Sequence, residues 1–327
     1  MARWTAVDIP DQTGRTAVVT GGNTGIGLHT ALELSRGGAR VVLTSRDRGK
    51  GEEAIRRIRT EVPEADIALG ILDLAVLASV RRFAGQILDR EGSIDLLVNN
   101  GGVMAVPERR ITADGFELQL GTNHLGHFAL TGLLLPALLA APRPRVVTVS
   151  SVTHRMGRIR FDDLQGERRY GPWRAYSQSK LANLLFALEL DRRAGAMGLD
   201  LVSVASHPGT SATNLQAAGP RLGRFNLWAR GGAAMMRPLR QPAARGALPS
   251  LYAATAPDVA GGEFYGPDGP AQVRGFPVRV TPARRALDRE VARRLWAVSE
   301  ELTGVAFGWD GHRERGALDS IRAPAGT

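Results

Sequence analysis

Short apolar runs alternate with longer amphipathic segments over the first two thirds of the chain. The short runs are rich in β-branched residues, which predicts strands at 16–20, 41–44, 67–72, 94–98, 145–150 and 201–205. The segments between them repeat their apolar positions with a helical period, which predicts helices at 26–36, 52–61, 76–89, 125–139 and 175–194. Strands with little internal polarity that alternate with helices are typical of a parallel β-sheet with helices on both faces. We therefore expect a doubly wound α/β fold, the Rossmann type, whose ligands bind at the carboxyl ends of the strands.

The regular alternation ends near residue 210. Gly, Pro, Arg and Ala dominate from Ala217 to Arg245, and we interpret residues 211–245 as a segment that covers the substrate; a surface excursion without a role is the alternative. Further on, the pattern predicts a helix at 243–255, a last strand that begins at Phe264 and Tyr265, and a helix at 291–302. We expect a single domain over residues 14–312, with an N-terminal extension at 1–13 and a tail at 313–327.

The composition excludes several kinds of chemistry. The chain has no cysteine, which rules out disulfides, thiolate catalysis and Cys-ligated metal sites, and which fits the reducing cytoplasm where we expect the protein to be. We expect no metal site. The most apolar window, Phe128 to Ala141, is interrupted by Gly132 and Pro136 and falls short of the roughly 20 residues that span a bilayer. It predicts a buried helix, so no membrane span is expected.

The formal net charge is +10. It has three explanations: arginines scattered over solvated helix faces, attraction of a polyanionic cofactor, or binding to nucleic acid or an anionic membrane. The arginines form no sustained basic run with interleaved aromatic residues, and pairs such as Arg56-Arg57 stand in segments that also carry acids. We therefore favour the scattered arrangement and expect no nucleic-acid partner.

A glycine-rich turn, Thr20-Gly21-Gly22-Asn23-Thr24-Gly25-Ile26-Gly27, joins the first strand to the first helix. Such a turn presents backbone N–H groups and a helix N-terminus to a pyrophosphate, and its glycines permit a close approach. After the second strand stands Ser45-Arg46, with no acidic residue there to bind the ribose hydroxyls. Arg46 is suited to pairing with a 2′-phosphate, so NADP(H) is preferred over NAD(H). A solvated loop arginine is the alternative interpretation.

Tyr176 and Lys180 lie one helical turn apart and share a face. A tyrosine with its ordinary pKa of about 10 is a poor acid–base group near neutral pH, and a cation one turn away lowers that pKa. Taken singly, the two would be a packed tyrosine and a solvated lysine. The strand at 145–150 ends in Ser150-Ser151, where a hydroxyl can stabilise charge on a substrate oxygen or simply cap a turn.

These motifs, in this order, resemble the short-chain dehydrogenase/reductase superfamily over residues 14–210. The matching residues are the glycine-rich turn, Asp73-Leu74, Asn99-Asn100-Gly101-Gly102, Asn123, Ser150-Ser151, Tyr176-Ser177-Gln178-Ser179-Lys180 and His207-Pro208-Gly209. One residue departs from the family pattern, because Gly101 stands where an alanine is usual.

The resemblance implies a role for each catalytic candidate. Tyr176 is the general acid in reduction and the base in oxidation, and Ser151 orients the substrate oxygen. Lys180 lowers the pKa of the tyrosine and holds the nicotinamide ribose. Asn123 kinks its helix and holds a water that links Lys180 to solvent; a packed polar residue is the alternative.

The resemblance also implies a set of cofactor contacts. Asp73 would contact the adenine, Asn99 and Gly101 would line its pocket, and Thr210 would meet the carboxamide or a phosphate. Asp73 as a helix cap and His207 as a core histidine are the plain alternatives. With Arg46 included, the predicted cofactor residues are Gly21, Asn23, Thr24, Gly25, Ile26, Gly27, Arg46, Asp73, Leu74, Asn99, Asn100, Gly101, Tyr176, Lys180, Pro208, Gly209 and Thr210.

A finer resemblance points to the retinol-dehydrogenase-like branch, which includes the WW-domain oxidoreductases. It is carried by Asn123-His124-Leu125-Gly126-His127-Phe128, Ser179-Lys180-Leu181-Ala182-Asn183 and Ser206-His207-Pro208-Gly209-Thr210. The branch implies an NADP(H)-dependent oxidoreductase that acts on a small hydrophobic aldehyde, ketone or alcohol, such as a retinoid or a steroid. A regulator or scaffold that binds NADP(H) without turnover is the alternative, and the sequence leaves open whether the chain forms a homo-oligomer.

Overall fold

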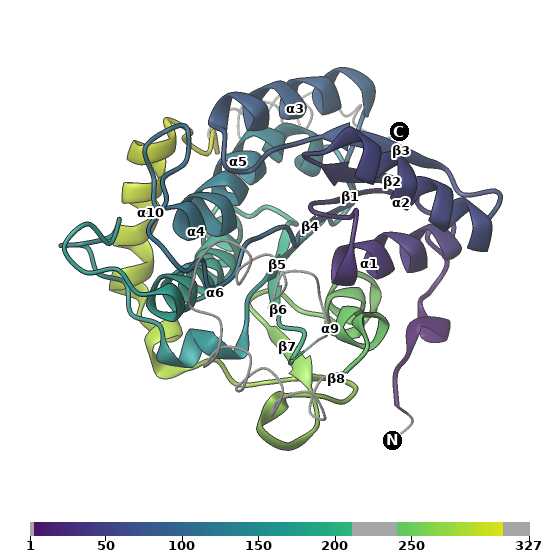
Figure 1. The fold of residues 1–327 in the computed structure, drawn as a ribbon. Helices are drawn as coiled ribbons and strands as arrows, with labels where there is room; N and C mark the ends of the chain where they lie inside the picture. The colour runs from purple at the N-terminus through teal and green to yellow at the C-terminus, as the bar shows by residue number, and fades with distance from the viewer. Residues whose placement is uncertain (1–2, 211–240, 310–327) are drawn as a thin grey trace, which may run out of the picture.

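The strands of the protein form one twisted sheet in the order β3-β2-β1-β4-β5-β6-β7-β8 (Figure 1). The structure is a computed structural model and describes residues 3–210 and 241–309. The first seven strands run parallel, and β8 pairs antiparallel with β7. The strands are β1 (Thr16–Val19), β2 (Arg40–Ser45), β3 (Ile67–Ile71), β4 (Leu96–Asn99), β5 (Arg145–Val149), β6 (Val202–Ser206), β7 (Phe264–Pro267) and β8 (Pro277–Arg279). The predicted doubly wound α/β fold is confirmed.

Apart from α4, the described α-helices overlap the segments in which the apolar periodicity predicts them. They are α1 (Gly25–Arg36), α2 (Arg48–Glu61), α3 (Leu77–Arg90), α4 (Leu118–Leu120), α5 (Gly126–Leu139), α6 (Pro172–Ala196), α9 (Ala243–Thr255) and α10 (Arg289–Thr303). The predicted start of α2 is wrong by four residues, because Asp47 caps the helix by accepting the Lys50 N–H at 3.0 Å. The helix before β5 also begins earlier than predicted, since α4 and a π turn precede α5.

Alternate residues of each central strand face opposite layers of helices. Ala17 and Val19 of β1 pack with α1, α2 and α9, whereas Val18 packs with α3, α5 and the middle of α6. Figure 1 shows these two layers on either side of the sheet. Because both faces of the sheet are covered, the strands read as continuous apolar runs, and the polar chemistry is left to the loops at their ends.

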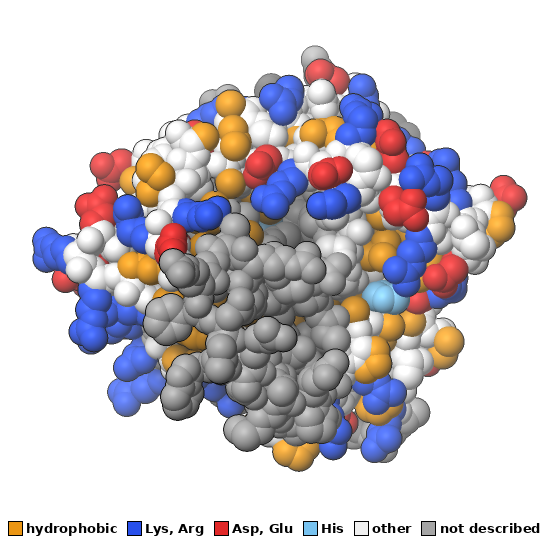
Figure 2. Space-filling view, viewed as in Figure 1, with side chains coloured by type: hydrophobic (Ala, Val, Ile, Leu, Met, Phe, Trp, Pro, Cys, Tyr) orange, Lys and Arg blue, Asp and Glu red, His pale blue; other side chains and the backbone are white. Residues whose placement is uncertain are grey.

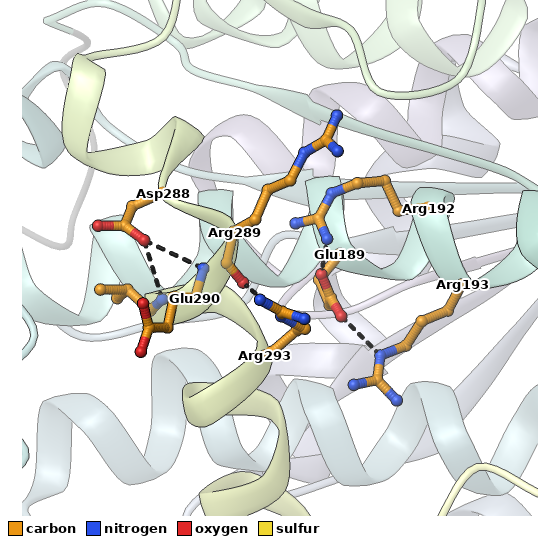
Figure 3. A network of polar contacts seen from close by, with 8 residues as sticks. Glu189, Arg192, Arg193, Asp288, Arg289, Glu290 and Arg293 are labelled. Carbon is orange, nitrogen blue, oxygen red and sulfur yellow. Dashed lines mark hydrogen bonds and ion pairs between the residues drawn. The ribbon is translucent and has the colours of Figure 1, made fainter.

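The long helix α6 is held from outside by α10, which lies beside it in Figure 1. Glu189 of α6 is buried and accepts hydrogen bonds from Arg192 and Arg193 (Figure 3). The Arg193 guanidinium stacks on Trp296 of α10, 4.4 Å from the ring centroid. These contacts fix the helix that carries Tyr176 and Lys180.

Other expectations meet the structure in part. The window from Phe128 to Ala141 forms the buried helix α5, and no helix among the described residues is long and apolar enough to cross a membrane. Of the 211–245 segment, 211–240 lie outside the described residues, as does the 313–327 tail, while 243–245 begin α9. On the face in Figure 2, basic side chains are spread out with acidic ones among them, in agreement with scattered charge.

Candidate active site

The glycine-rich turn between β1 and α1 is folded so tightly that side chains have no room. A Cβ on Gly27 would lie 2.4 Å from the Gly21 carbonyl oxygen, and a Cβ on Gly21 would lie 2.8 Å from the Gly101 Cα. Gly21 also has a positive φ of 62°. The turn leads into α1, whose first turn carries no acidic side chain. A close-packed backbone that leads into a helix N-terminus without acidic side chains suits an anion such as a pyrophosphate, so these residues fit a dinucleotide.

Thr20 and Asn100 join this turn to the end of β4. The Thr20 hydroxyl accepts the N–H groups of Asn100 at 2.8 Å and Gly101 at 2.9 Å, and the Asn100 amide donates to the Thr20 carbonyl at 2.8 Å. The neighbouring Asn99 side chain turns the other way and donates to Thr131 of α5 at 3.0 Å. The Asn99 side chain is therefore engaged with α5, whereas the Asn100 side chain holds the glycine turn.

Two further turns flank this position. Arg46 is exposed directly after β2, and the adjacent carboxylate of Asp47 is occupied as the cap of α2. After β3, the Asp73 carboxylate accepts the Ala75 N–H at 2.9 Å, so it braces its own turn, and Leu74 is buried next to Gly101. Both turns lie at the same edge of the sheet as the glycine turn, because neighbouring parallel strands end together.

The turn after β6 is fixed by residues that are distant in the chain. The Thr210 N–H donates to the Val273 carbonyl at 2.7 Å, and the Gln241 side chain donates to the Pro208 carbonyl at 2.8 Å. Gly209 has a φ of 64°, and a Cβ there would meet the Val273 oxygen at 2.4 Å. These hydrogen bonds hold the backbone of Pro208, Gly209 and Thr210 in place at the carboxyl end of β6.

Asn123 lies in a π turn, Gly121–Leu125, between α4 and α5. Its side chain makes a reciprocal pair of hydrogen bonds with the Val103 backbone, at 2.8 and 2.9 Å, and donates to the Ser179 hydroxyl at 2.9 Å. π turns are rare and occur often at functional sites. The turn brings Asn123 to the loop after β4 and to α6, the helix that carries Lys180. The water that Asn123 is expected to hold stays a prediction.

Tyr176, Lys180 and Ser151 come together at the carboxyl end of β5, and all three are buried. The Lys180 ammonium lies 5.9 Å from the centroid of the Tyr176 ring and donates to the Val149 carbonyl at 3.0 Å. The Ser150 hydroxyl donates to the Lys180 carbonyl at 2.7 Å, so it binds the backbone of α6. Ser151 is the serine whose side chain forms a hydrogen bond with Tyr176.

Burial controls the ionisation of this group. Burial raises the pKa of Tyr176 to about 12, and a hydrogen bond with Ser151 opposes that rise. Burial lowers the pKa of Lys180 to about 8. Desolvation thus raises the pKa of Tyr176, in contrast to the lowering that we expected from the lysine. The phenol holds its proton at neutral pH, and the lysine is easily neutralised.

Sequence reasoning passed over three residues that shape this site. Gly102 allows Asn123 to approach, since a Cβ there would lie 2.7 Å from the Asn123 Oδ1. Thr20 and the buried His127 connect the glycine turn to α5, because the Thr20 hydroxyl lies 2.8 Å from the His127 Nε2. The motif letters include these residues, but only the folded chain shows their contacts. No three His, Asp or Glu side chains gather as a metal site within the described ranges.

The fold and the site together define the class of protein. A sequence model of the short chain dehydrogenase family matches residues 15–220, and the chain belongs to this family of oxidoreductases. Within the family it belongs to the retinol-dehydrogenase-like branch. It is 43% identical over 296 residues to human retinol dehydrogenase 13, covering 89% of this chain and 85% of that protein. It is 40% identical to mouse retinol dehydrogenase 12, covering 93% and 90%.

Solved structures share the fold. An uncharacterized protein from Mycobacterium paratuberculosis is similar with a TM-score of 0.77 and 46% sequence identity, covering 94% of this chain and 99% of that one. A short chain dehydrogenase from Shigella flexneri, solved with NADP, shares the fold at a TM-score of 0.60 and 22% identity, covering 79% and 97%.

Proposed function

We propose that the protein is an NADP(H)-dependent oxidoreductase that interconverts a hydrophobic carbonyl compound and its alcohol, with Tyr176 as the acid–base residue. The observation that carries the proposal is the burial of Tyr176, Ser151 and Lys180 in one group at the edge where the glycine turn lies. A bound nicotinamide supplies or accepts the hydride. The residues of the chain must then hold the substrate oxygen and move one proton.

In the direction of reduction, the substrate carbon gains a hydride and its oxygen gains a proton. Ser151 donates a hydrogen bond to that oxygen, which orients it and stabilises its developing negative charge. Tyr176 donates its phenolic proton to the substrate oxygen and becomes a phenolate. Lys180 stabilises the phenolate through its positive charge, and Tyr176 then recovers a proton from solvent past Lys180 and Asn123. In oxidation the same proton moves from the alcohol to the phenolate.

The preference for NADP(H) rests on the turn after β2. Arg46 is exposed there, while Asp47 is engaged as the helix cap and lies 3.8 Å from Lys50. A carboxylate aimed at the ribose would repel a 2′-phosphate, whereas a guanidinium pairs with it through charge-assisted hydrogen bonds. The proposed cofactor is therefore the phosphorylated dinucleotide.

The substrate class rests on the relatives. The similar human and mouse proteins are named retinol dehydrogenases, and their matches cover most of both chains. Retinal-like, steroid-like and simple aliphatic or aromatic aldehydes and ketones are the compounds to test first. The expected cytoplasmic location stays a prediction, as does assembly into a homo-oligomer.

The test is oxidation of NADPH and of NADH, followed by absorbance, with a panel of hydrophobic aldehydes and ketones. Tyr176→Phe should lower kcat by roughly 10²–10⁴-fold, the usual contribution of a general acid, and leave the Kd for NADPH nearly unchanged. Tyr252→Phe is the matched control, because the Tyr252 hydroxyl bonds Asp258 on the opposite layer of the sheet.

Two results would oppose the proposal. Wild-type turnover in Tyr176→Phe would remove the acid–base assignment. Tight NADPH binding without turnover of any compound in the panel would favour the alternative, a regulator or scaffold that binds NADP(H) and performs no chemistry.

A further inference from the structure

His127 occupies a buried position that the proposed chemistry leaves unexplained. It lies in the first turn of α5 and is 1% exposed. Its Nε2 lies 2.8 Å from the Thr20 hydroxyl in the glycine turn, and its Nδ1 lies 2.9 Å from the Asn123 carbonyl in the π turn. One imidazole therefore touches both the cofactor turn and the backbone of a catalytic candidate.

The surrounding donors determine which nitrogen carries the proton. The Thr20 hydroxyl accepts two backbone N–H groups, from Asn100 and Gly101, which occupy both of its lone pairs. It can then only donate, and the His127 Nε2 at 2.8 Å is closer than the Val98 carbonyl at 3.2 Å. The Nδ1 faces a carbonyl oxygen and must carry the hydrogen. Burial lowers the pKa of His127 to about 4, so the ring is neutral, with its hydrogen on Nδ1.

We propose that His127 is a positioning residue that couples the cofactor-binding glycine turn to Asn123. The inference rests on the proposed function. The hydrogen bonds run in one direction, from the Thr20 hydroxyl to Nε2 and from Nδ1–H to the Asn123 carbonyl, so each polarises the next. In a π turn the backbone pairs five residues apart instead of four. The His127 Nδ1–H donates to the carbonyl of Asn123, four residues earlier in the chain, and the second lone pair of that carbonyl oxygen is left for another donor.

The consequence is a linkage between cofactor binding and the catalytic group. The Thr20 hydroxyl is also the acceptor that ties the turn after β4 to the glycine turn. A cofactor that binds this turn would restrict the position of Thr20, and through His127 it would restrict the position of the Asn123 carbonyl. Asn123 in turn contacts Ser179, the residue before Lys180.

His124 provides a matched control in the same π turn. It is equally buried at 1% exposed, and its Nε2 lies 2.9 Å from the Ser299 hydroxyl of α10. That hydroxyl donates its own proton to the Leu295 carbonyl at 2.7 Å, so His124 must carry its hydrogen on Nε2. His124 and His127 are therefore neutral rings with opposite tautomers, and only His127 reaches the glycine turn.

The experiment is ¹⁵N NMR of the two imidazoles in the full-length protein, titrated with NADPH, together with kinetics of single variants. We expect His127 protonated on Nδ1 and His124 on Nε2, with the His127 signals alone shifting on NADPH addition. His127→Leu should weaken NADPH binding and lower kcat, each by about 3–10-fold, since a hydrogen bond contributes roughly this factor. His127→Gln, whose amide offers a donor and an acceptor, should restore part of both.

His124→Leu is expected to lower Tm while Kd and kcat stay within about twofold of wild type, the range of a change that reaches no ligand. Equal effects of His127→Leu and His124→Leu on Kd and kcat would overturn the inference, as would a His127 protonated on Nε2. The NMR titration and the Kd values need no turnover. Absence of turnover in the wild type would therefore count against the proposed function alone, and the NADPH response of His127 would still decide the coupling.

Discussion

Replacing Gly102 with alanine would place a methyl carbon 2.7 Å from the Asn123 Oδ1 and 3.8 Å from the Lys180 ammonium. Real Cβ contacts are essentially never shorter than 3.0 Å, so one partner must move. The Asn123 side chain is fully buried and held by hydrogen bonds to Val103 and Ser179. Gly102 itself is outside the positive-φ region, so the backbone tolerates alanine and the collision is the main effect.

The magnitude follows from the bonds that the movement of Asn123 would break. Losing one buried hydrogen bond and leaving its partner unsatisfied costs about 1–3 kcal/mol. For a chain of 327 residues, 2 kcal/mol corresponds to a fall in Tm of roughly 3 °C. Because the added methyl group would contact both Asn123 and the Lys180 ammonium, we expect kcat to fall by at least ~10-fold, equivalent to about 1.4 kcal/mol of transition-state stabilisation.

Gly101→Ala is the neighbouring control. Its Cβ would meet the Leu74 Cδ1 at 2.8 Å and other atoms only at 3.4 Å, and a leucine terminus can rotate away. A shifted rotamer costs about 0.5–1.5 kcal/mol, so Tm should fall by only about 1–2 °C and activity should survive. Differential scanning fluorimetry and steady-state kinetics measure both variants. Wild-type kcat and Tm in Gly102→Ala, or equal damage in both variants, would refute the reasoning.

Three further perturbations test separate parts of the site. Arg46→Asp should change the ratio of kcat/KM for NADPH to that for NADH by roughly 10–100-fold toward NADH, because a charge-assisted bond contributes about 1.5–3 kcal/mol; an unchanged ratio would contradict the assignment. Glu189→Gln should lower the free energy of unfolding by about 1–2 kcal/mol in a urea titration, since the paired Arg192 and Arg193 remain partly solvated. For carbonyl reduction, kcat/KM should fall as pH rises through about 8, where Lys180 loses its charge. Lys180→Arg cannot deprotonate, and any activity that it keeps should lack this limb.

The pH prediction has a counterpart in stability. Burial lowers the folded-state pKa of Lys180 below its ordinary value of 10.5. Between about 8 and 10.5 the unfolded chain therefore binds more protons at this residue than the folded one, and the contribution of Lys180 to stability rises with pH in that window. As pH rises above about 8, the folded protein therefore loses the positive charge of Lys180 that catalysis needs, and the free-energy cost of burying that charge falls.

The element pattern could be predicted because the sheet is covered on both faces. Strands such as β4 and β5 must be apolar throughout, and the helices between them must repeat their apolar positions, so the order of elements is written in local sequence. The grouping of Ser151, Tyr176 and Lys180 could be predicted for a related reason. Tyr176 and Lys180 share a helical turn, and Ser151 follows a strand, so local geometry and the resemblance together were enough. β8 was missed because a three-residue edge strand carries too short a pattern.

The sequence alone therefore determined the fold class, the edge of the sheet where ligands bind, and the residue types available there. Tertiary structure decided how those residues are used. Ser150 bonds the carbonyl of Lys180, Asn99 turns toward Thr131, and His127 joins Thr20 to Asn123. The physical reason is that periodicity and turns depend on neighbours in the chain, whereas a hydrogen bond between residues thirty or more positions apart depends on how the packed elements meet. Burial likewise set the pKa values of Tyr176 and Lys180, because desolvation comes only from the folded surroundings.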